Sequence, residues 1–208
     1  MIDGDERDAG SLLDDLARSA EAKAAQSAAL SAATLQACDA QLDQIADAMA
    51  ERFAGGGRLF TFGNGGSATD AAGVAALFTH PPGGRSLAGR SLASDESVLT
   101  ALANDIGFDW VFSRQLIAHA RPGDIAMGFS TSGNSDNVIK AFEEARRRDV
   151  LTVGFAGYDG GAMGACADLQ HCVIVRSDSV HRIQEAQSAT AYQLWNRVQT
   201  RLDGEAAA

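Results

Sequence analysis

Asp124-Ile-Ala-Met-Gly-Phe-Ser-Thr-Ser-Gly-Asn-Ser-Asp136 is the stretch of sequence that decides the fold. Its apolar part, residues 125–129, has the length of a strand, and the pattern of residues 138–148 predicts an amphipathic helix. The four hydroxyl residues between these two segments are Ser130, Thr131, Ser132 and Ser135. Hydroxyls donate hydrogen bonds, and a helix start offers free N–H groups and the positive end of its dipole. The stretch therefore predicts an anion-binding loop, suited to a phosphate.

Two plainer interpretations compete with a phosphate loop. Ser135 or Asn134 could simply cap the helix, which would leave an ordinary strand-to-helix connection. A lipase-type nucleophile elbow is also conceivable, but residues 128–132 lack the closing glycine of that motif. Because a helix cap needs one hydroxyl and this loop has four, we favour the anion site.

Composition limits the class of protein. The 208 residues suit one globular domain with a single core, with 46% apolar and 21% charged residues. A net charge of −10 argues against nucleic-acid binding through a basic surface. Three cysteines without paired spacing predict neither a disulfide framework nor a zinc cluster. No signal peptide or membrane-length apolar run is recognisable, so we expect a cytoplasmic protein with no membrane association. We also expect no cofactor.

The order of predicted elements indicates an α/β fold. We expect a polar leader at 1–10, followed by one domain at 11–204. The domain begins with an N-terminal helical pair at 11–54. The two helices of this pair are predicted to span 11–33 and 35–54. Alanine-rich faces of this pair suit close helix packing, either between subunits or within one chain. The α/β core at 58–202 has predicted strands at 58–62, 90–93, 125–129, 151–156 and 172–175. Predicted helices follow at 68–78, 97–104, 110–120, 138–148, 161–167 and 180–202. This alternation implies a parallel sheet with helices on both faces.

A glycine-rich turn, Gly63-Asn-Gly-Gly-Ser67, follows the first strand of this core. Gly63, Gly65 and Ala68 satisfy the dinucleotide fingerprint, and Arg85 is a candidate partner for a 2′-phosphate, so an NADP-dependent enzyme is one hypothesis. The glycines also let backbone N–H groups approach a ligand, with Asn64 and Ser67 adding polar contacts. A mononucleotide or a sugar phosphate fits this turn as well as a dinucleotide does.

Five ordered motifs resemble the sugar isomerase (SIS) domain family, and within it most closely the phosphoheptose isomerase group, which acts on sedoheptulose 7-phosphate. They are Gly63-Asn-Gly-Gly-Ser67, Ala103-Asn-Asp105, Ser130-Thr-Ser-Gly-Asn-Ser135, Gly157-Tyr-Asp-Gly-Gly161 and Arg182-Ile-Gln-Glu185. The resemblance implies a flavodoxin-like, doubly wound sheet of five parallel strands. It also implies a homotetramer that binds substrate between subunits.

The resemblance assigns substrate-binding roles to particular residues. Ser130, Thr131, Ser132 and Ser135 would hold the sugar phosphate, and Asn64, Gly65 and Ser67 would close the site. Asp95 matches an aspartate that lines the sugar end, and Asp105 falls on a similar substrate-side motif. Gln184 matches one of four positions that bind zinc in some members.

The catalytic positions of the family are not matched. Its histidine and glutamate on the helix after the glycine turn fall on Gly73 and Leu77, and a later histidine falls on Tyr192. Leucine cannot remove a proton and glycine cannot bind a metal, so the resemblance predicts that the family's base and zinc site are lost.

Three residues remain as candidate bases: Glu185, His181 and Asp70, with Tyr192 as a possible acid. We prefer Glu185 because it lies in an intact motif, although a carboxylate base needs a pKa raised by burial. Each residue can also be an ordinary polar group at a helix start. Two functions follow: a phosphosugar isomerase with an altered site, or a non-catalytic SIS protein that binds a phosphosugar or a protein partner.

Overall fold

The computed structural model describes residues 9–206. Residues 1–8, which make up most of the predicted leader, lie outside the described residues. The strands are β1 (Leu59–Gly63), β2 (Gly89–Ser91), β3 (Ile125–Ser130), β4 (Leu151–Gly157) and β5 (His171–Val175). The helices are α1 (Ala9–Ala37), α2 (Asp39–Ala54), α3 (Gly66–Thr79), α4 (Glu96–Asp105), η1 (Phe108–Trp110), α5 (Val111–His119), α6 (Asp136–Arg147), α7 (Gly161–Gly164) and α8 (Val180–Ala206).

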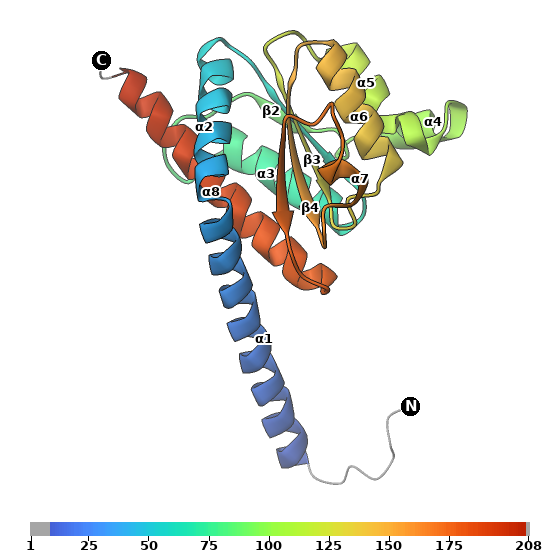
Figure 1. The fold of residues 1–208 in the computed structure, drawn as a ribbon. Helices are drawn as coiled ribbons and strands as arrows, with labels where there is room; N and C mark the ends of the chain where they lie inside the picture. Colours follow the sequence, from blue (N-terminus) through green and yellow to red (C-terminus); the bar gives the residue numbers. More distant parts are fainter. Residues whose placement is uncertain (1–8, 207–208) are drawn as a thin grey trace.

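The five strands form one parallel sheet in the order β2-β1-β3-β4-β5, which confirms the predicted flavodoxin-like architecture. The register pairs Gly63 with Phe129, and Gly157 with Val175. The carboxyl ends of β1, β3, β4 and β5 therefore meet at one edge of the sheet. Figure 1 shows helices on both sides of this sheet.

Two apolar clusters lie on opposite faces of the sheet. One joins α2, α3 and α8 to side chains such as Met127 and Phe129, and the other joins α5 and α6 to Phe60 and Phe62. Strands β1, β3 and β4 are buried throughout their length, as expected when helices cover both faces. On β3 a glycine is required, because a Cβ at Gly128 would lie 2.6 Å from the ring of Phe142.

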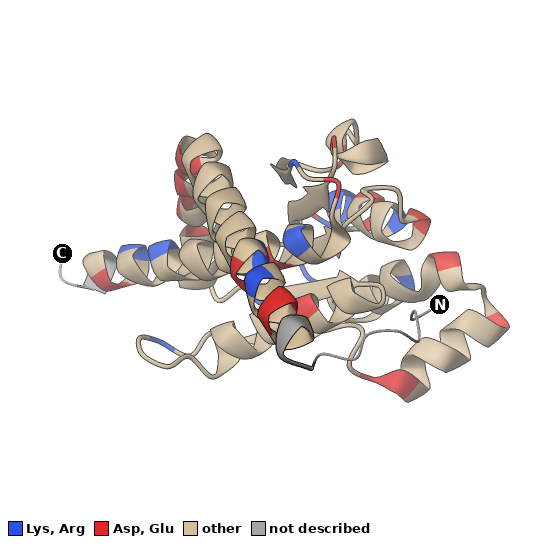
Figure 2. Cartoon of the chain, turned by 90° about the horizontal axis from the view of Figure 1, so that it is seen from below, with Lys and Arg blue, Asp and Glu red and all other residues tan. Residues whose placement is uncertain are grey.

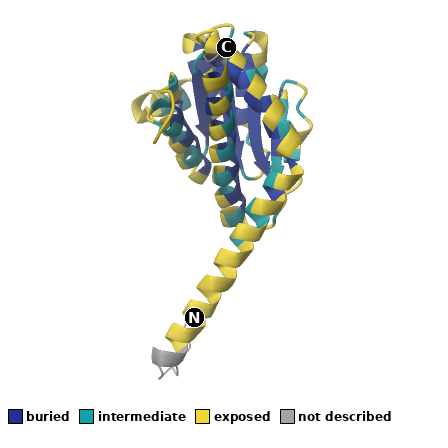
Figure 3. Cartoon of the chain, turned by 90° about the vertical axis from the view of Figure 1, so that its left-hand side faces the viewer, coloured by how far each residue is buried: buried dark blue, intermediate teal, exposed yellow. Residues whose placement is uncertain are grey.

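Helix α1 extends well beyond the body of the protein (Figures 1 and 3). Residues 12–26 are all exposed, including Leu13 at 65% and Leu16 at 56%. The rest of α1 packs on α8. The predicted break between the first two helices at residue 34 is wrong, because α1 continues to Ala37 and α2 begins after Cys38. The alanine-rich stretch there contains no helix breaker, so nothing ends the helix earlier.

Ion pairs join α2 to α8. Arg197 pairs with Asp39 and Asp43, and Arg201 pairs with Asp43 and Asp47. Basic and acidic segments are interspersed along the helices in Figure 2. Among the described residues, no helix combines the length and the apolar character that a membrane span requires.

Candidate functional site

The candidate site lies where the sheet reverses its winding direction. The turn after β1 leads into α3 on one face, whereas the loop after β3 leads into α6 on the other face. Ligands of open parallel sheets bind in the crevice at this switch point. Asn64 and Asn137 hold the crevice together: each side-chain amide donates to the oxygen of the other, at 2.8 and 3.0 Å.

Three hydroxyls converge in the loop of residues 130–135, here called the hydroxyl loop. The Ser130 Oγ lies 2.9 Å from the Ser135 Oγ and 3.4 Å from the Ser132 Oγ. Ser135 occupies the N-cap position of α6, but within the described residues its side chain makes no capping hydrogen bond. The hydroxyls are thus turned toward one another, and the simple helix-cap interpretation does not describe Ser135. Thr131 lies in the same loop.

The loop after β4 packs against the hydroxyl loop and holds its conformation. Gly133 has a φ of 66°, and a Cβ there would lie 2.1 Å from the carbonyl oxygen of Gly160. The Asn134 Oδ1 accepts from the backbone N–H of Ala162 at 2.8 Å, and the Met163 N–H donates to the Gly133 carbonyl at 2.9 Å. We did not predict this supporting role of residues 157–163 from the sequence, although the paired glycines at 160 and 161 are a signal of close backbone contact.

The glycine turn, residues 63–67, brings the start of α3 against α8. A Cβ at Gly66 would lie 2.2 Å from the Nε2 of Gln184, so only glycine allows this approach. Gly65 adopts a φ of 56°, and the Ser67 side chain is buried. The turn therefore places Gln184, from a distant part of the chain, beside the first turn of α3.

Asp70, on α3, accepts hydrogen bonds from two residues of α8. Its Oδ2 accepts from the Gln184 Nε2, and its Oδ1 accepts from the Ser188 Oγ, both at 3.2 Å. Burial raises the pKa of Asp70, and the two neutral donors only partly oppose this effect. Asp70 lines a cavity of about 470 Å³, here called the Asp70 cavity. Its other lining residues are Gly66, Thr69, His181, Gln184, Glu185 and Ser188.

Glu185 lies at the same cavity but in a different environment. Its carboxylate is exposed and accepts from the hydroxyl of Ser27 on α1 and from the Arg182 Nη1. The Ser27 hydrogen bond, followed by that of Arg182, lowers the pKa of Glu185. A base at Glu185 would need a raised pKa, whereas the pKa is lowered here because the side chain is paired and exposed rather than buried. His181 is an exposed residue at the same cavity.

The three positions that the resemblance aligns with the family's catalytic residues lie together in space. Gly73, Leu77 and Tyr192 line a cavity of about 320 Å³, here called the apolar cavity, with Thr69, Asp70, Val74 and Ser188. Asp70 and Ser188 are shared with the Asp70 cavity. Glycine, leucine and tyrosine at these places do not fit a tetrahedral zinc site. In the described part of the chain, no group of three His, Cys, Asp or Glu residues is arranged to hold a metal.

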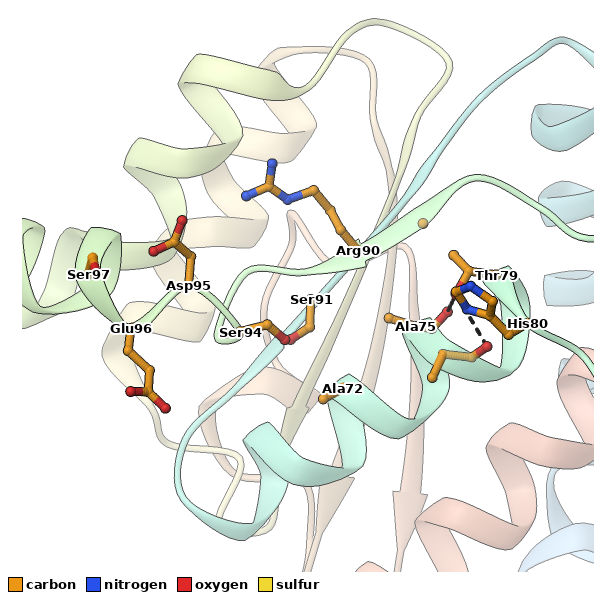
Figure 4. A pocket seen from close by; sticks show the side chains of 12 residues that line it. Ala72, Ala75, Thr79, His80, Arg90, Ser91, Ser94, Asp95, Glu96 and Ser97 are labelled. Atoms are coloured by element: carbon orange, nitrogen blue, oxygen red, sulfur yellow. Dashed lines mark hydrogen bonds between the residues drawn. The ribbon is translucent and has the colours of Figure 1, made fainter.

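Asp95 lies in a separate cavity of about 660 Å³ beside β2 (Figure 4). Its Oδ1 accepts from the Val98 N–H at 3.0 Å and so caps α4. Figure 4 shows Asp95 and Arg90 across the cavity from Thr79 and His80. The residues that line the Asp70 cavity do not include Asp95. Asp105 ends α4 and accepts from the Asn104 side chain.

Arg85 cannot serve the glycine turn as a 2′-phosphate partner. It lies beyond the opposite end of α3, whose 14 residues span about 21 Å. There it pairs with Asp203, and its backbone N–H donates to Gln199. The geometry therefore removes the one residue that supported an NADP-dependent enzyme over other phosphate ligands.

The parallel five-stranded sheet, the glycine turn and the hydroxyl loop at its switch point define a class of phosphosugar-binding α/β domain. A comparison with protein families places residues 24–157 in the SIS domain family, and the chain belongs to that family. The predicted family resemblance is thereby confirmed.

Relatives within the family are phosphoheptose isomerases. The chain is 40% identical over 171 residues to the phosphoheptose isomerase of Rhodospirillum rubrum, covering 79% of this chain and 88% of that protein. It is 45% identical over 155 residues to that of Chlorobaculum tepidum, covering 71% and 72% respectively. Among solved structures, the phosphoheptose isomerase GmhA from Neisseria gonorrhoeae superposes with a TM-score of 0.82 at 34% identity, over 89% of this chain and 99% of that chain.

Proposed function

We propose that this protein is a phosphosugar isomerase that interconverts an aldose and a ketose phosphate of the phosphoheptose type, without a metal ion. The similarity to phosphoheptose isomerases supports the reaction class. The observation that carries the proposal is Asp70, a half-buried carboxylate with a raised pKa on the helix that starts in the glycine turn.

The hydroxyl loop is the proposed phosphate site. Hydroxyls of Ser130, Ser132 and Ser135 can each turn a proton toward a phosphate oxygen, and Thr131 adds a fourth donor. The first N–H groups of α6 lack partners within the helix and carry its positive dipole end. Asn64 and Ser67 border the crevice on the side of β1, and the exposed backbone of Gly65 permits close approach.

Asp70 is the proposed base. Isomerisation through an enediol moves one proton between C1 and C2 and one between the two oxygens, so that substrate and product have the same composition. A carboxylate with a raised pKa can take the carbon-bound proton and return it to the neighbouring carbon. Gln184 and Ser188 hold Asp70 in position, and His181 borders the same cavity as a candidate for proton transfer between the oxygens.

Glu185 becomes the second choice as base. Its pKa is lowered, which favours the ionised form but weakens it as a proton acceptor at neutral pH. Its bonds to Ser27 and Arg182 suit a residue that ties α1 to the start of α8.

We further propose a homotetramer with sites between subunits, in the cytoplasm. The exposed leucines of α1 support association, because an isolated helix of this kind gains little stability in water. The three free cysteines suit a reducing compartment. Light scattering at micromolar concentration should give a mass near four times 21.6 kDa, whereas a monomer of 21.6 kDa would contradict the assembly.

The test of the proposed reaction is proton exchange in heavy water. Ketose phosphates of six and seven carbons should incorporate deuterium at C1 or C2, and treatment with a chelator should leave the rate unchanged. Exchange that is lost with chelator and restored by zinc would contradict a metal-free site.

A second function is favoured by the apolar cavity. The three positions that the resemblance aligns with the family's histidines and glutamate are Gly73, Leu77 and Tyr192, none of them a carboxylate or a histidine. The absence of such groups at these positions suits a protein that binds a phosphosugar or a protein partner without turnover. Phosphosugar binding without any exchange for these substrates would support this alternative.

A further inference from the structure

A third polar cavity lies at the ends of β4 and β5, outside the proposed reaction site. Its volume is about 490 Å³, and its lining residues are Tyr158, Asp159, Arg176, Ser177 and Asp178. Because Gly157 pairs with Val175, Tyr158 and Arg176 are the first residues beyond the paired ends of two neighbouring strands. Such strands lie about 4.8 Å apart, so the two residues border one opening.

This cavity adjoins the hydroxyl loop without being part of it. A Cβ at Gly157 would lie 2.4 Å from the Thr131 carbonyl oxygen, so the backbone before Tyr158 touches the hydroxyl loop. The following residues, 160–163, support that loop from behind. The loop that contacts the proposed phosphate site therefore also contributes Tyr158 to the cavity that Arg176 lines.

Tyr158 has an unusual backbone conformation. Its φ is 53°, in the left-handed region that bulky residues seldom adopt and glycine adopts freely. Its neighbours Gly157, Gly160 and Gly161 show that this loop uses glycine where the backbone demands it. An aromatic residue retained in such a conformation suggests that its side chain has a use.

The polar groups of the cavity decide which ligand it suits. Arg176 donates only, Asp159 and Asp178 accept only when ionised, and the hydroxyls of Tyr158 and Ser177 do both. In the described residues Arg176 forms no ion pair, although the two carboxylates line the same cavity. Two carboxylates beside a single guanidinium disfavour a second phosphate. The hydroxyls of an uncharged sugar can donate to the two carboxylates and accept from Arg176. The C–H face of its ring can lie on the aromatic ring of Tyr158.

We propose that this cavity is a second carbohydrate site, which binds an uncharged sugar through Tyr158 and Arg176, next to the phosphate site and independent of it. Tyr158 provides the apolar surface, Arg176 provides donors, and Asp159 and Asp178 provide acceptors. The loop after β4 contacts both sites, so the sugar would lie beside the bound phosphosugar.

The test uses the full-length protein in its assembled state, with sedoheptulose and D-mannose as unphosphorylated probes. Saturation-transfer NMR should detect contact with at least one of them, with an affinity in the millimolar range. Tyr158→Gly removes the ring and the unfavourable φ together, and it should abolish the transfer. Arg176→Gln should weaken binding by ~10-fold, as expected for the loss of a hydrogen bond to a charged group. Tyr158→Phe and Arg114→Gln, the latter in a different cavity, should leave binding unchanged.

Inorganic phosphate, measured by calorimetry, separates this proposal from the proposed function. Phosphate should bind the hydroxyl loop equally in the wild type and in all four variants, without displacing the sugar. Sugar contact that phosphate displaces, or that survives Tyr158→Gly, would overturn the second site while leaving the phosphate site intact. The absence of contact with either sugar in the wild type would overturn it as well. Thermal unfolding checks the fold of each variant, and Tyr158→Gly should unfold at or above the wild-type temperature.

Discussion

The hydroxyl loop and the apolar cavity are built in different ways. The hydroxyl loop depends on backbone conformation: Gly133 must be left-handed, Asn134 is tied to the next loop, and the hydroxyls meet because the turn brings them together. The apolar cavity depends on side chains that project from two helices, α3 and α8. Changing Leu77 or Tyr192 alters its chemistry without disturbing any backbone hydrogen bond. Binding can thus be retained while the chemistry beside it changes.

Asp70 links the apolar cavity to the Asp70 cavity. It lies on α3 one turn before Gly73, and it lines both the Asp70 cavity and the apolar cavity. In the proposed isomerase, Asp70 is the base on which the reaction depends.

The largest expected effect belongs to Asp70→Asn. This change keeps the shape and removes the base, so exchange of the C1 or C2 proton should fall by ~10²-fold or more. Phosphosugar affinity, measured by calorimetry, should change little, because the hydroxyl loop is untouched. The matched control is Glu185→Gln, whose effect should be much smaller. A full loss of exchange in Glu185→Gln with none in Asp70→Asn would reverse this assignment.

The next largest effect concerns the hydroxyl loop. Ser132→Ala combined with Ser135→Ala removes two donors to a charged group, each worth roughly 1.5–3 kcal/mol. Phosphosugar affinity should therefore fall at least ~10-fold. The unfolding temperature should change little, because among the described residues the Ser135 hydroxyl accepts no capping hydrogen bond and the Ser132 hydroxyl accepts only one backbone hydrogen bond, from the Asn134 N–H in an exposed turn. Ser97→Ala, at the start of α4, serves as the control. Unaltered binding in the double variant would remove the phosphate site from this loop.

A smaller effect is expected of Gly66→Ala. The added methyl would overlap the flexible end of Gln184, so the amide must move away from Asp70. Losing one hydrogen bond of ~1 kcal/mol should slow exchange about fivefold while phosphosugar binding persists. Gly73→Ala is the matched control, since a Cβ there meets open space. Equal rates in both variants would mean that Gln184 does not position Asp70.

The fold was largely predictable because its signals are local. Apolar runs such as residues 125–129 and 151–156 are strands buried on both faces, and the helix patterns between them leave only a parallel arrangement. Boundaries were less predictable where nothing in the chain marks them. Alanine-rich residues 31–37 continue α1, and the predicted helix at 161–167 shortens to Gly161–Gly164 because the chain turns toward β5.

The site was only partly predictable, for a physical reason. Ser130, Ser132 and Ser135 are close in sequence, so their convergence followed from the loop itself. The environments of Asp70 and Glu185 depend on contacts with residues more than a hundred positions away in the sequence. Asp70 contacts Gln184 and Ser188. Glu185 contacts Ser27. No local pattern indicates which carboxylate becomes buried. The preferred base from the sequence was therefore Glu185, whereas the carboxylate with a raised pKa is Asp70.

The smallest effect concerns pH and stability, and it tests the burial of Asp70 without any substrate. The folded-state pKa of Asp70 is raised above its ordinary value of 3.8, so the folded protein favours the protonated carboxyl. The contribution of Asp70 to the free energy of unfolding is fully present when the pH is below the ordinary pKa of 3.8. It is lost as the pH rises through the folded-state pKa. Asp70→Asn carries no such loss, so its unfolding temperature relative to wild type should increase as pH is raised from about 3 to about 7. Glu185→Gln should show the opposite trend over the same range, because the pKa of Glu185 is lowered. Parallel unfolding curves for wild type and Asp70→Asn across this range would mean that Asp70 is solvated like a surface aspartate, and that its pKa is not suited to a base.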